Sequence, residues 1–447
     1  MSTSTERPHV AVFAFPFGTH AAPLLTLVQR LAVAEPNTIF SFFSTTQSNQ
    51  KTFSRTKFGK NIKPYNVFDG VPEGHVFSGH PLEAVGLYLK ETPNNYKKRL
   101  AEVVEDTGME ISCLLSDAFL WFSAKMAEEM GVPWVAFWTA GPTSILVHLY
   151  DMKKGKGELV DQSLNFLPGM SAIYFSDLPA ELTGNLDEPF SHLLYKMGSM
   201  VPHAKAVVLN SYEELDPICV DDLQSKVQML LNVGLFTLAS PPPSYFDENG
   251  CISWLDKREA SSVAYLSFGT ILTPPPPELL ALAEALEEKG VSFLWSLRDP
   301  TQHSLLEGFL ERTSPLGKIV PWTPQIEVLK HPSVGVFVTH CGWNSVVESI
   351  AGGVPMICRP YFGDQKLNRR LITDVWQIGA SVKGDIFTKK GMMGALDDVL
   401  SKKNGTKMRE NIGVLKEKAM NAVGVNGRST KNFKTLLKVV TGCEDAQ

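Results

Sequence analysis

Short, almost continuously apolar runs recur along the chain and are separated by segments of helix length. Such runs predict strands buried on both faces. Their alternation with helical segments such as Pro23–Val33 and Ala118–Met130 predicts βαβ units in parallel sheets. The predicted strands lie at 9–15, 38–45, 111–119, 133–140 and 204–212 in the first half, and at 263–270, 291–298, 318–322, 333–340, 354–360 and 378–384 in the second. We therefore expect an α/β fold with two doubly wound, Rossmann-like domains that face each other across a cleft.

The pattern is interrupted once, at the stretch LASPPPSYFDENGC (238–251). This density of proline, serine and turn formers is typical of a linker. A chain of 447 residues is long enough for two or three domains with separate cores. We expect an N-terminal domain over 1–237, a linker over 238–252 and a C-terminal domain over 253–429.

Charge and cysteine content exclude several kinds of partner. The chain has 42 Lys and Arg against 47 Asp and Glu, and no basic run, so we expect neither nucleic acid nor an anionic membrane as a partner. Six cysteines without a CxxC pair indicate reduced thiols and a cytoplasmic location. No signal-peptide pattern and no window of about 18 apolar residues occurs, so no integral membrane contact is expected.

Common nucleotide and metal motifs are missing. Neither half contains GxGxxG after its first strand or the motif GxxxxGK[ST], which disfavours dinucleotide oxidoreductases and P-loop kinases. No Asp-x-Asp pair is present to hold a catalytic divalent cation. We expect neither a metal nor a bound cofactor.

One helix start has the features of a pyrophosphate site. The strand 333–340 ends at His340, and Gly342 opens the following helix, whose unpaired N–H groups attract phosphate oxygens. Asn344 and Ser345 add side-chain donors, and Glu348 lies one turn further along, where it could accept from a ribose diol. An ordinary helix cap is the alternative reading, but a cap alone does not explain His340, Trp343 and Glu348 together.

Two neighbouring strand ends carry further candidates. Trp322, beside Pro324 and Gln325, offers a flat ring on which a nucleobase could stack, although a single Trp is more often part of a core. Asp364 and Gln365 form an acceptor–donor pair suited to sugar hydroxyls, and the alternative is a solvated loop. Ligands of open α/β sheets bind at the carboxyl ends of strands, which is where these residues are expected.

In the first half, His20 and Asp117 are expected at the carboxyl ends of two strands of one sheet. If they meet, Asp117 would fix the imidazole tautomer and His20 would act as a general base toward a hydroxyl. The alternative is an exposed histidine at a helix start. A Cys–His hydrolase built from His340 and Cys341 is excluded, because neighbouring residues of a strand point to opposite faces.

The stretch from Trp322 to Gln365 resembles the signature box of plant UDP-sugar-dependent glycosyltransferases, WTPQ…LKH…FVTHCGWNS..E….GVPM…P…DQ. The resemblance implies the two-domain GT-B fold, UDP-glucose as co-substrate and a C-terminal segment (430–447) that returns to the N-terminal domain. It also implies His20 as the base and Asp117 as its partner. The donor roles that it implies are uracil stacking by Trp322, ribose binding by Gln325 and Glu348, phosphate binding by Thr270, His340, Asn344 and Ser345, and sugar binding by Thr139, Trp343, Asp364 and Gln365.

Segments such as AFPFGTHAAPLL, SDAFLWF and AFWTAGPTSILVH resemble the branch that acts on the 3-hydroxyl of flavonols and anthocyanidins. Gln365 is that family's usual residue for glucose. The resemblance implies an aromatic acceptor slot formed by Phe15, Phe119 and Phe362, with His148 as a hydrogen-bonding group. Lys366 and Leu82 depart from the family pattern, and they bear on donor and acceptor choice respectively.

The function expected from these observations is inverting, metal-independent transfer of glucose from UDP-glucose to a flavonoid hydroxyl by a monomeric enzyme. Two alternatives remain open at this point. One is transfer to another small phenolic or terpenoid acceptor. The other is a non-catalytic nucleotide-sugar-binding protein, which would have no need for His20 and Asp117.

Overall fold

The computed structural model describes residues 7–54, 58–79, 82–150, 162–182, 184–185, 187–239, 247–298, 305 and 308–442. The chain divides into two compact units. The first comprises Met1–Glu158, Ala180–Phe236 and Ala422–Gln447, and the second comprises Leu159–Pro179 and Thr237–Asn421. Most of the predicted linker, at 240–246, lies outside the described residues.

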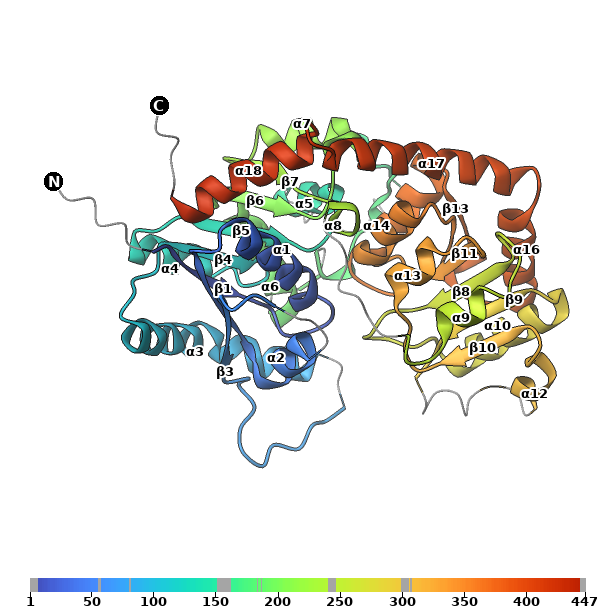
Figure 1. Cartoon of the computed structure of the whole chain (residues 1–447), viewed down its shortest axis with the longest axis horizontal. Coiled ribbons are helices and arrows are strands. Elements are labelled where there is room, and N and C mark those ends of the chain that lie inside the picture. Colours follow the sequence, from blue (N-terminus) through green and yellow to red (C-terminus); the bar gives the residue numbers. More distant parts are fainter. Residues whose placement is uncertain are drawn as a thin grey trace. The chain divides into compact units, whose positions relative to one another are not determined.

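The first unit is built on a parallel sheet, which has seven strands among the described residues (Figure 1). The strands, in spatial order, are β3 (Ile62–Val67), β2 (Ile39–Thr45), β1 (His9–Phe13), β4 (Cys113–Asp117), β5 (Trp134–Trp138), β6 (Ala206–Leu209) and β7 (Leu230–Asn232). Five of them match predicted strands, and β3 and β7 were missed. Both are edge strands. In β3 only Ile62 and Val67 at its ends are buried and Pro64 lies between them, so it forms no apolar run, whereas β7 is a buried strand of three residues that was not recognised.

Helices pack against this sheet and complete the βαβ units. They are α1 (Ala21–Ala34), α2 (Thr46–Phe53), α3 (Glu83–Thr107), α4 (Ser123–Met130), α5 (Pro142–Leu149), α6 (Pro189–Met200), α7 (Pro217–Gln224) and α18 (Arg428–Thr441). The helix predicted at Ala118–Met130 begins five residues later. The Asp117 carboxylate accepts the N–H of Phe119 at 2.9 Å, which folds the intervening residues into a turn.

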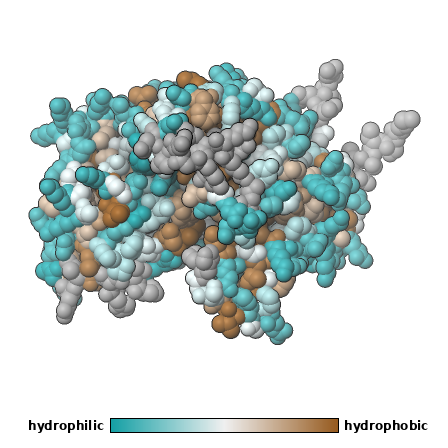
Figure 2. Space-filling model, turned by 180° about the vertical axis from the view of Figure 1, so that it is seen from behind, coloured by the Kyte–Doolittle hydropathy of each residue, from teal (hydrophilic) through white to brown (hydrophobic). Residues whose placement is uncertain are grey.

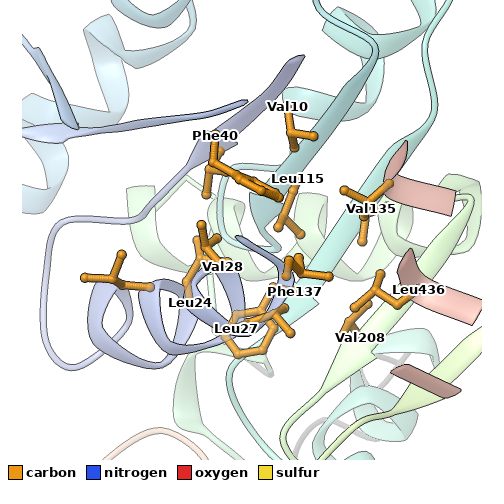
Figure 3. Packing of buried hydrophobic residues seen from close by; sticks show 14 of the residues in the cluster. Val10, Leu24, Leu27, Val28, Phe40, Leu115, Val135, Phe137, Val208 and Leu436 are labelled. Atoms are coloured by element: carbon orange, nitrogen blue, oxygen red, sulfur yellow. The ribbon is translucent and has the colours of Figure 1, made fainter. Parts of the chain in front are cut away.

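Side chains from α1, the central strands and α18 point toward one another in the core of this unit (Figure 3). Four of these side chains are fully buried: Leu24, Phe40, Val135 and Leu436. Because Leu436 belongs to α18, the last described helix of the chain contributes to the core of the first unit. The end of the predicted returning segment, 443–447, lies outside the described residues.

The second unit has a parallel sheet of six strands among its described residues, and all six were predicted. In spatial order they are β10 (Gly317–Val320), β9 (Ser292–Ser296), β8 (Val263–Ser267), β11 (Val334–Thr339), β12 (Met356–Cys358) and β13 (Gly379–Ser381). The helices are α9 (Cys251–Leu255), α10 (Pro276–Lys289), α12 (Phe309–Thr313), α13 (Gln325–Lys330), α14 (Trp343–Gly352), α15 (Gln365–Arg370) and α16 (Lys389–Leu400), and α8 (Phe236–Ala239) and α17 (Asn404–Val423) run across the unit boundaries. The prediction of two parallel-sheet, Rossmann-like α/β domains is confirmed.

Most of the surface shown in Figure 2 is hydrophilic, with small groups of apolar residues between the polar ones. Exposed apolar side chains include Val76 and Phe77, in the segment that precedes α3. Among the described helices, none has the length and apolar character that crossing a membrane requires.

Candidate active site

In the first unit, three neighbouring strands bring His20, Asp117 and Thr139 together. His20 precedes α1, Asp117 ends β4 and Thr139 follows β5, and β1, β4 and β5 are adjacent in the sheet. The His20 Nδ1 atom lies 2.8 Å from Asp117 Oδ2 and 3.2 Å from Thr139 Oγ1. The predicted meeting of His20 and Asp117 is thus seen in the geometry.

The environment of Asp117 selects one imidazole tautomer. An ionised carboxylate only accepts hydrogen bonds, so Nδ1 of His20 carries the proton and donates a hydrogen bond to Asp117. The Asp117 side chain is 1% exposed and its second oxygen accepts the Phe119 N–H. Within the described residues no hydrogen bond to His20 Nε2 occurs, so this nitrogen is available to accept a proton. This is the arrangement that a general base requires.

Aromatic rings surround His20. The ring centroids of Phe15 and Phe119 lie 5.1 Å and 4.5 Å from the imidazole centroid, and those of Phe15 and Phe119 lie 5.1 Å apart. Phe17 and Phe190 extend the cluster, at 5.3 Å from Phe15 and 6.1 Å from Phe119 respectively. Phe17 and Phe190 were not predicted from the sequence. Phe17 stands in the motif FPFGTH beside His20, which could have indicated it, whereas Phe190 had no such signal.

Two further acceptor residues were predicted, one in each unit. His148, on α5, donates from Nδ1 to the Ser144 carbonyl at 2.6 Å, so its Nε2 can only accept while the ring is neutral. Burial lowers the pKa of His148 to about 4, against a smaller opposite effect of the Ser144 carbonyl, so the ring is neutral near pH 7. Phe362 belongs to the second unit and is 39% exposed. Leu82, which precedes α3, is also 39% exposed.

In the second unit, the start of α14 has the geometry expected of an anion site. Gly342 is the N-cap residue, with extended backbone, and Val346, Val347 and Ile350 are buried on the core side of the helix as predicted. Asn344 is part-buried, and Trp343 is only 4% exposed. The Trp343 ring is therefore part of the packing around the helix start.

His340 sits tightly against two glycine backbones. A Cβ atom on Gly342 would lie 2.5 Å from His340 Nε2, and one on Gly269, whose φ is +75°, would lie 2.9 Å from the same ring. Burial lowers the pKa of His340 to about 4, so the ring is neutral near pH 7. Its buried Nδ1 has no hydrogen-bond partner within the described part of the chain. Thr270, next to Gly269, is exposed, and its carbonyl accepts from Arg298 at 3.4 Å.

A polar network joins Gln325, at the start of α13, to α14. The Gln325 Nε2 group donates to Glu348 Oε2 at 2.7 Å and to Ser345 Oγ at 3.2 Å. The buried Tyr265 hydroxyl donates to Gln325 Oε1 at 3.0 Å, which fixes the orientation of the amide. Tyr265 was not predicted, because its place inside strand β8 reads as core. Burial raises the pKa of the Glu348 carboxyl to about 7, although the Gln325 amide acts in the opposite direction.

The remaining candidates in the second unit lie in the loop after β12, at the start of α15 and before α13. Gln365, 4% exposed, accepts the N–H groups of Tyr361 and Phe362 at 2.8 Å and 3.2 Å. Asn368 donates to Asp364 Oδ2 and to the Cys341 carbonyl, both at 2.9 Å, and so connects this loop to the turn before α14. Trp322, part-buried before α13, has its carbonyl bound by Asn249 at 2.9 Å. Lys366 is part-buried on α15.

Comparison with known proteins identifies the family. Residues 251–418 match the family model described as UDP-glucoronosyl and UDP-glucosyl transferase. A flavonol 3-O-glucosyltransferase of Actinidia chinensis var. chinensis is 54% identical over 454 residues, which cover 99% of this chain and 99% of the relative. The chain belongs to this UDP-glycosyltransferase family. The family predicted from the signature box is therefore confirmed.

Other relatives of this UDP-glycosyltransferase are named for the transfer of different sugars, glucose or galactose. An anthocyanidin 3-O-glucosyltransferase of Vitis vinifera is 51% identical, with 100% of both chains covered. An anthocyanidin 3-O-galactosyltransferase of Rhododendron delavayi is also 51% identical, with 97% of both chains covered. Overall identity therefore does not distinguish between the two sugars.

The crystal structure of a UDP-glucose:anthocyanidin 3-O-glucosyltransferase in complex with UDP matches the glycosyltransferase with a TM-score of 0.91 and 42% identity. The match covers 98% of this chain and 100% of the other. This likeness confirms the predicted GT-B class of fold. Within the described ranges of the glycosyltransferase, no cluster of three or more His, Cys, Asp or Glu side chains could hold a metal ion.

Proposed function

We propose that this glycosyltransferase transfers glucose from UDP-glucose to the 3-hydroxyl group of a flavonol or anthocyanidin. Relatives of about 50% identity over nearly the whole chain carry names of this activity. The observation that carries the proposal is the 2.8 Å contact between His20 Nδ1 and Asp117 Oδ2, which leaves Nε2 as a proton acceptor beside aromatic rings. A protein that only bound nucleotide sugars would not need this pair.

In the proposed reaction, His20 Nε2 removes the proton of the acceptor hydroxyl as the oxygen attacks the anomeric carbon of glucose. A phenolic hydroxyl has a pKa near 10, so little of it is ionised at neutral pH without a base. The bond from the anomeric carbon to the UDP oxygen breaks on the opposite face, so a single displacement inverts the configuration. Asp117 stabilises the imidazolium that forms.

In the second unit, the proposed donor site begins at α14. The N–H groups of the helix start, with His340, Asn344, Ser345 and Thr270, would bind the diphosphate and stabilise the charge of the leaving UDP without a metal. Trp322 would stack on uracil. Because Gln325 and Glu348 are already joined at 2.7 Å, they would present a fixed acceptor pair to the ribose diol.

Asp364, Gln365, Trp343 and Thr139 are proposed to hold the sugar, with Gln365 favouring glucose. Phe15, Phe119, Phe362 and His148 are proposed for the acceptor; His148, as a neutral ring, would accept a hydrogen bond from a flavonoid hydroxyl. We also propose that the enzyme is monomeric and that it is cytoplasmic; the five described cysteines, all buried free thiols, support the cytoplasmic location.

The test is incubation of purified protein with UDP-glucose and quercetin or cyanidin, with product identified by mass and regiochemistry by NMR. We expect UDP release and a 3-O-β-glucoside. His20→Ala should lower kcat by about 10²–10⁴-fold, the usual contribution of a positioned base.

A matched control is His331→Ala, which removes another His–Asp contact, to Asp256 at 3.1 Å in the second unit. This variant should keep its activity within about twofold, since His331 has no place in the proposed reaction. Substantial turnover by His20→Ala would remove His20 from the role of base. A wild-type protein that binds UDP-glucose without turnover on any phenolic or terpenoid acceptor would contradict the enzyme proposal itself.

A further inference from the structure

Asp177 stands at an unusual point of the chain. It ends a short 3₁₀ turn, Phe175–Asp177, within the segment Leu159–Pro179. This segment belongs to the second unit, although the residues before and after it belong to the first. The first half of the sequence therefore supplies a side chain to the unit that contains α14 and α15.

The Asp177 carboxylate binds the C-terminal end of α15. Arg369 Nη2 donates to Asp177 Oδ1 at 2.8 Å, and Arg370 donates from Nε to Oδ2 at 3.0 Å and from Nη2 to Oδ1 at 3.3 Å. The side chains are 2%, 13% and 21% exposed for Asp177, Arg369 and Arg370. The Tyr174 N–H also donates to Oδ2, at 3.0 Å, so the carboxylate is held from both sides.

The opposite end of α15 carries the residues proposed to bind the sugar. Gln365 is the first residue of the helix and Asp364 precedes it. Asn368, in the same helix, joins Asp364 to the Cys341 carbonyl. The helix has only six residues before it continues into the π-helical turn Leu371–Val375, so its position depends on its tertiary contacts, and the ion pairs with Asp177 are among them.

We propose that Asp177 is a positioning residue for the donor sugar, acting through Arg369 and Arg370 on Asp364 and Gln365. The inference rests on the proposed function, in which those two residues hold the sugar. Without the carboxylate, the two guanidinium groups lose their shared partner and keep only longer contacts, from Arg369 to Asp385 at 3.8 Å and from Arg370 to Asp374 at 3.6 Å. We therefore expect the last turn of α15 to shift. The residues proposed to bind the nucleotide lie on α13 and α14 or in the loops before them and after β8, and none lies on α15. The sugar end of the donor should therefore respond more than the nucleotide end.

The test compares UDP-glucose with UDP in Asp177→Asn, which keeps the size of the side chain and removes its charge. Dissociation constants come from titration calorimetry on the full chain, and KM and kcat from turnover. We expect the KM and Kd for UDP-glucose to rise roughly tenfold, as for a displaced positioning group, while the Kd for UDP changes by less than about twofold. A purely structural role would weaken both ligands equally.

Asp385→Asn is a matched control, since Asp385 pairs with the same Arg369 but at 3.8 Å and with higher exposure. It should leave the UDP-glucose KM within about twofold. If Asp177→Asn does not fold, Arg370→Gln is used in its place. Its Kd for UDP-glucose should rise by less than the roughly tenfold expected for Asp177→Asn but by more than the limit of about twofold set for the control. Unchanged UDP-glucose binding in a folded variant, or an equal loss for UDP and UDP-glucose, would overturn the inference. Failure of the wild-type protein to transfer glucose would instead overturn the proposed function.

Discussion

Glu348 makes the stability of the second unit depend on pH in a way that one substitution can expose. Burial is the main reason that the pKa of its carboxyl rises from 4.5 to about 7, and Glu327 adds to the effect while Gln325 opposes it. The folded protein therefore holds a proton that the unfolded chain has already lost. Below pH 4.5 both states are protonated, and stability falls as the pH rises from there to about 7.

The magnitude follows from the size of the rise. From 4.5 to about 7, at about 1.4 kcal/mol per pKa unit, the full cost of ionising Glu348 is about 3 kcal/mol. Glu348→Gln removes the titration and keeps an oxygen for the Gln325 amide, which lies 2.7 Å from the carboxylate. Relative to wild type, the variant should gain about 2–3 kcal/mol between pH 5 and pH 8, because part of the cost is already present at pH 5.

The assay is differential scanning calorimetry of both proteins at pH 5 and pH 8. For a domain of 150–250 residues, 1 kcal/mol corresponds to about 2–4 °C, so the difference in Tm should shift by about 4–12 °C in favour of the variant at pH 8. Glu287→Gln is the control, since its pKa is lowered by Arg312 and its substitution should not become more favourable as pH rises. A Tm difference that is constant with pH, or that moves toward wild type at pH 8, would refute the reasoning.

Two further predictions concern the candidate site. Asp117→Asn should reduce kcat by about 10²–10⁴-fold with little change in the UDP-glucose KM, because the amide no longer stabilises the imidazolium; stopped-time product assays measure it, and retention of most of kcat would show that Asp117 has no such role. Gly342→Ala places a Cβ atom 2.5 Å from His340 Nε2, so UDP affinity should fall about tenfold or more by calorimetry. Gly413→Ala, inside α17, is the control, because its Cβ meets open space; its affinity for UDP should stay unchanged and its free energy of unfolding should rise by about 0.5–1 kcal/mol. If Gly342→Ala bound UDP as tightly as the wild type, the tight fit at His340 would be contradicted.

Much of the fold and of the candidate site could be predicted because it depends on patterns of apolar and polar residues within short segments of the sequence. Buried central strands such as β1 and β11 are continuous apolar runs, and a polar residue such as Asp117 at the end of a run must lie at the carboxyl edge of a parallel sheet. The edge strand β3 was missed because its middle residues are exposed or partly exposed and form no such run, and β7 was missed although its three residues are buried.

Sequence by itself determined that His20 and Asp117 share one edge of a sheet, and which residues stand at the start of α14. Only the tertiary structure decided the hydrogen-bonding state of these groups. The lowered pKa of His340 depends on the burial of its ring against Gly269 and Gly342. Gly269 lies on a different strand end, far away in the sequence, so no local pattern reveals this contact. Asp177 read as an unremarkable acidic residue until folding placed it against Arg369 and Arg370, because an ion pair between distant segments has no periodicity from which it could be foreseen.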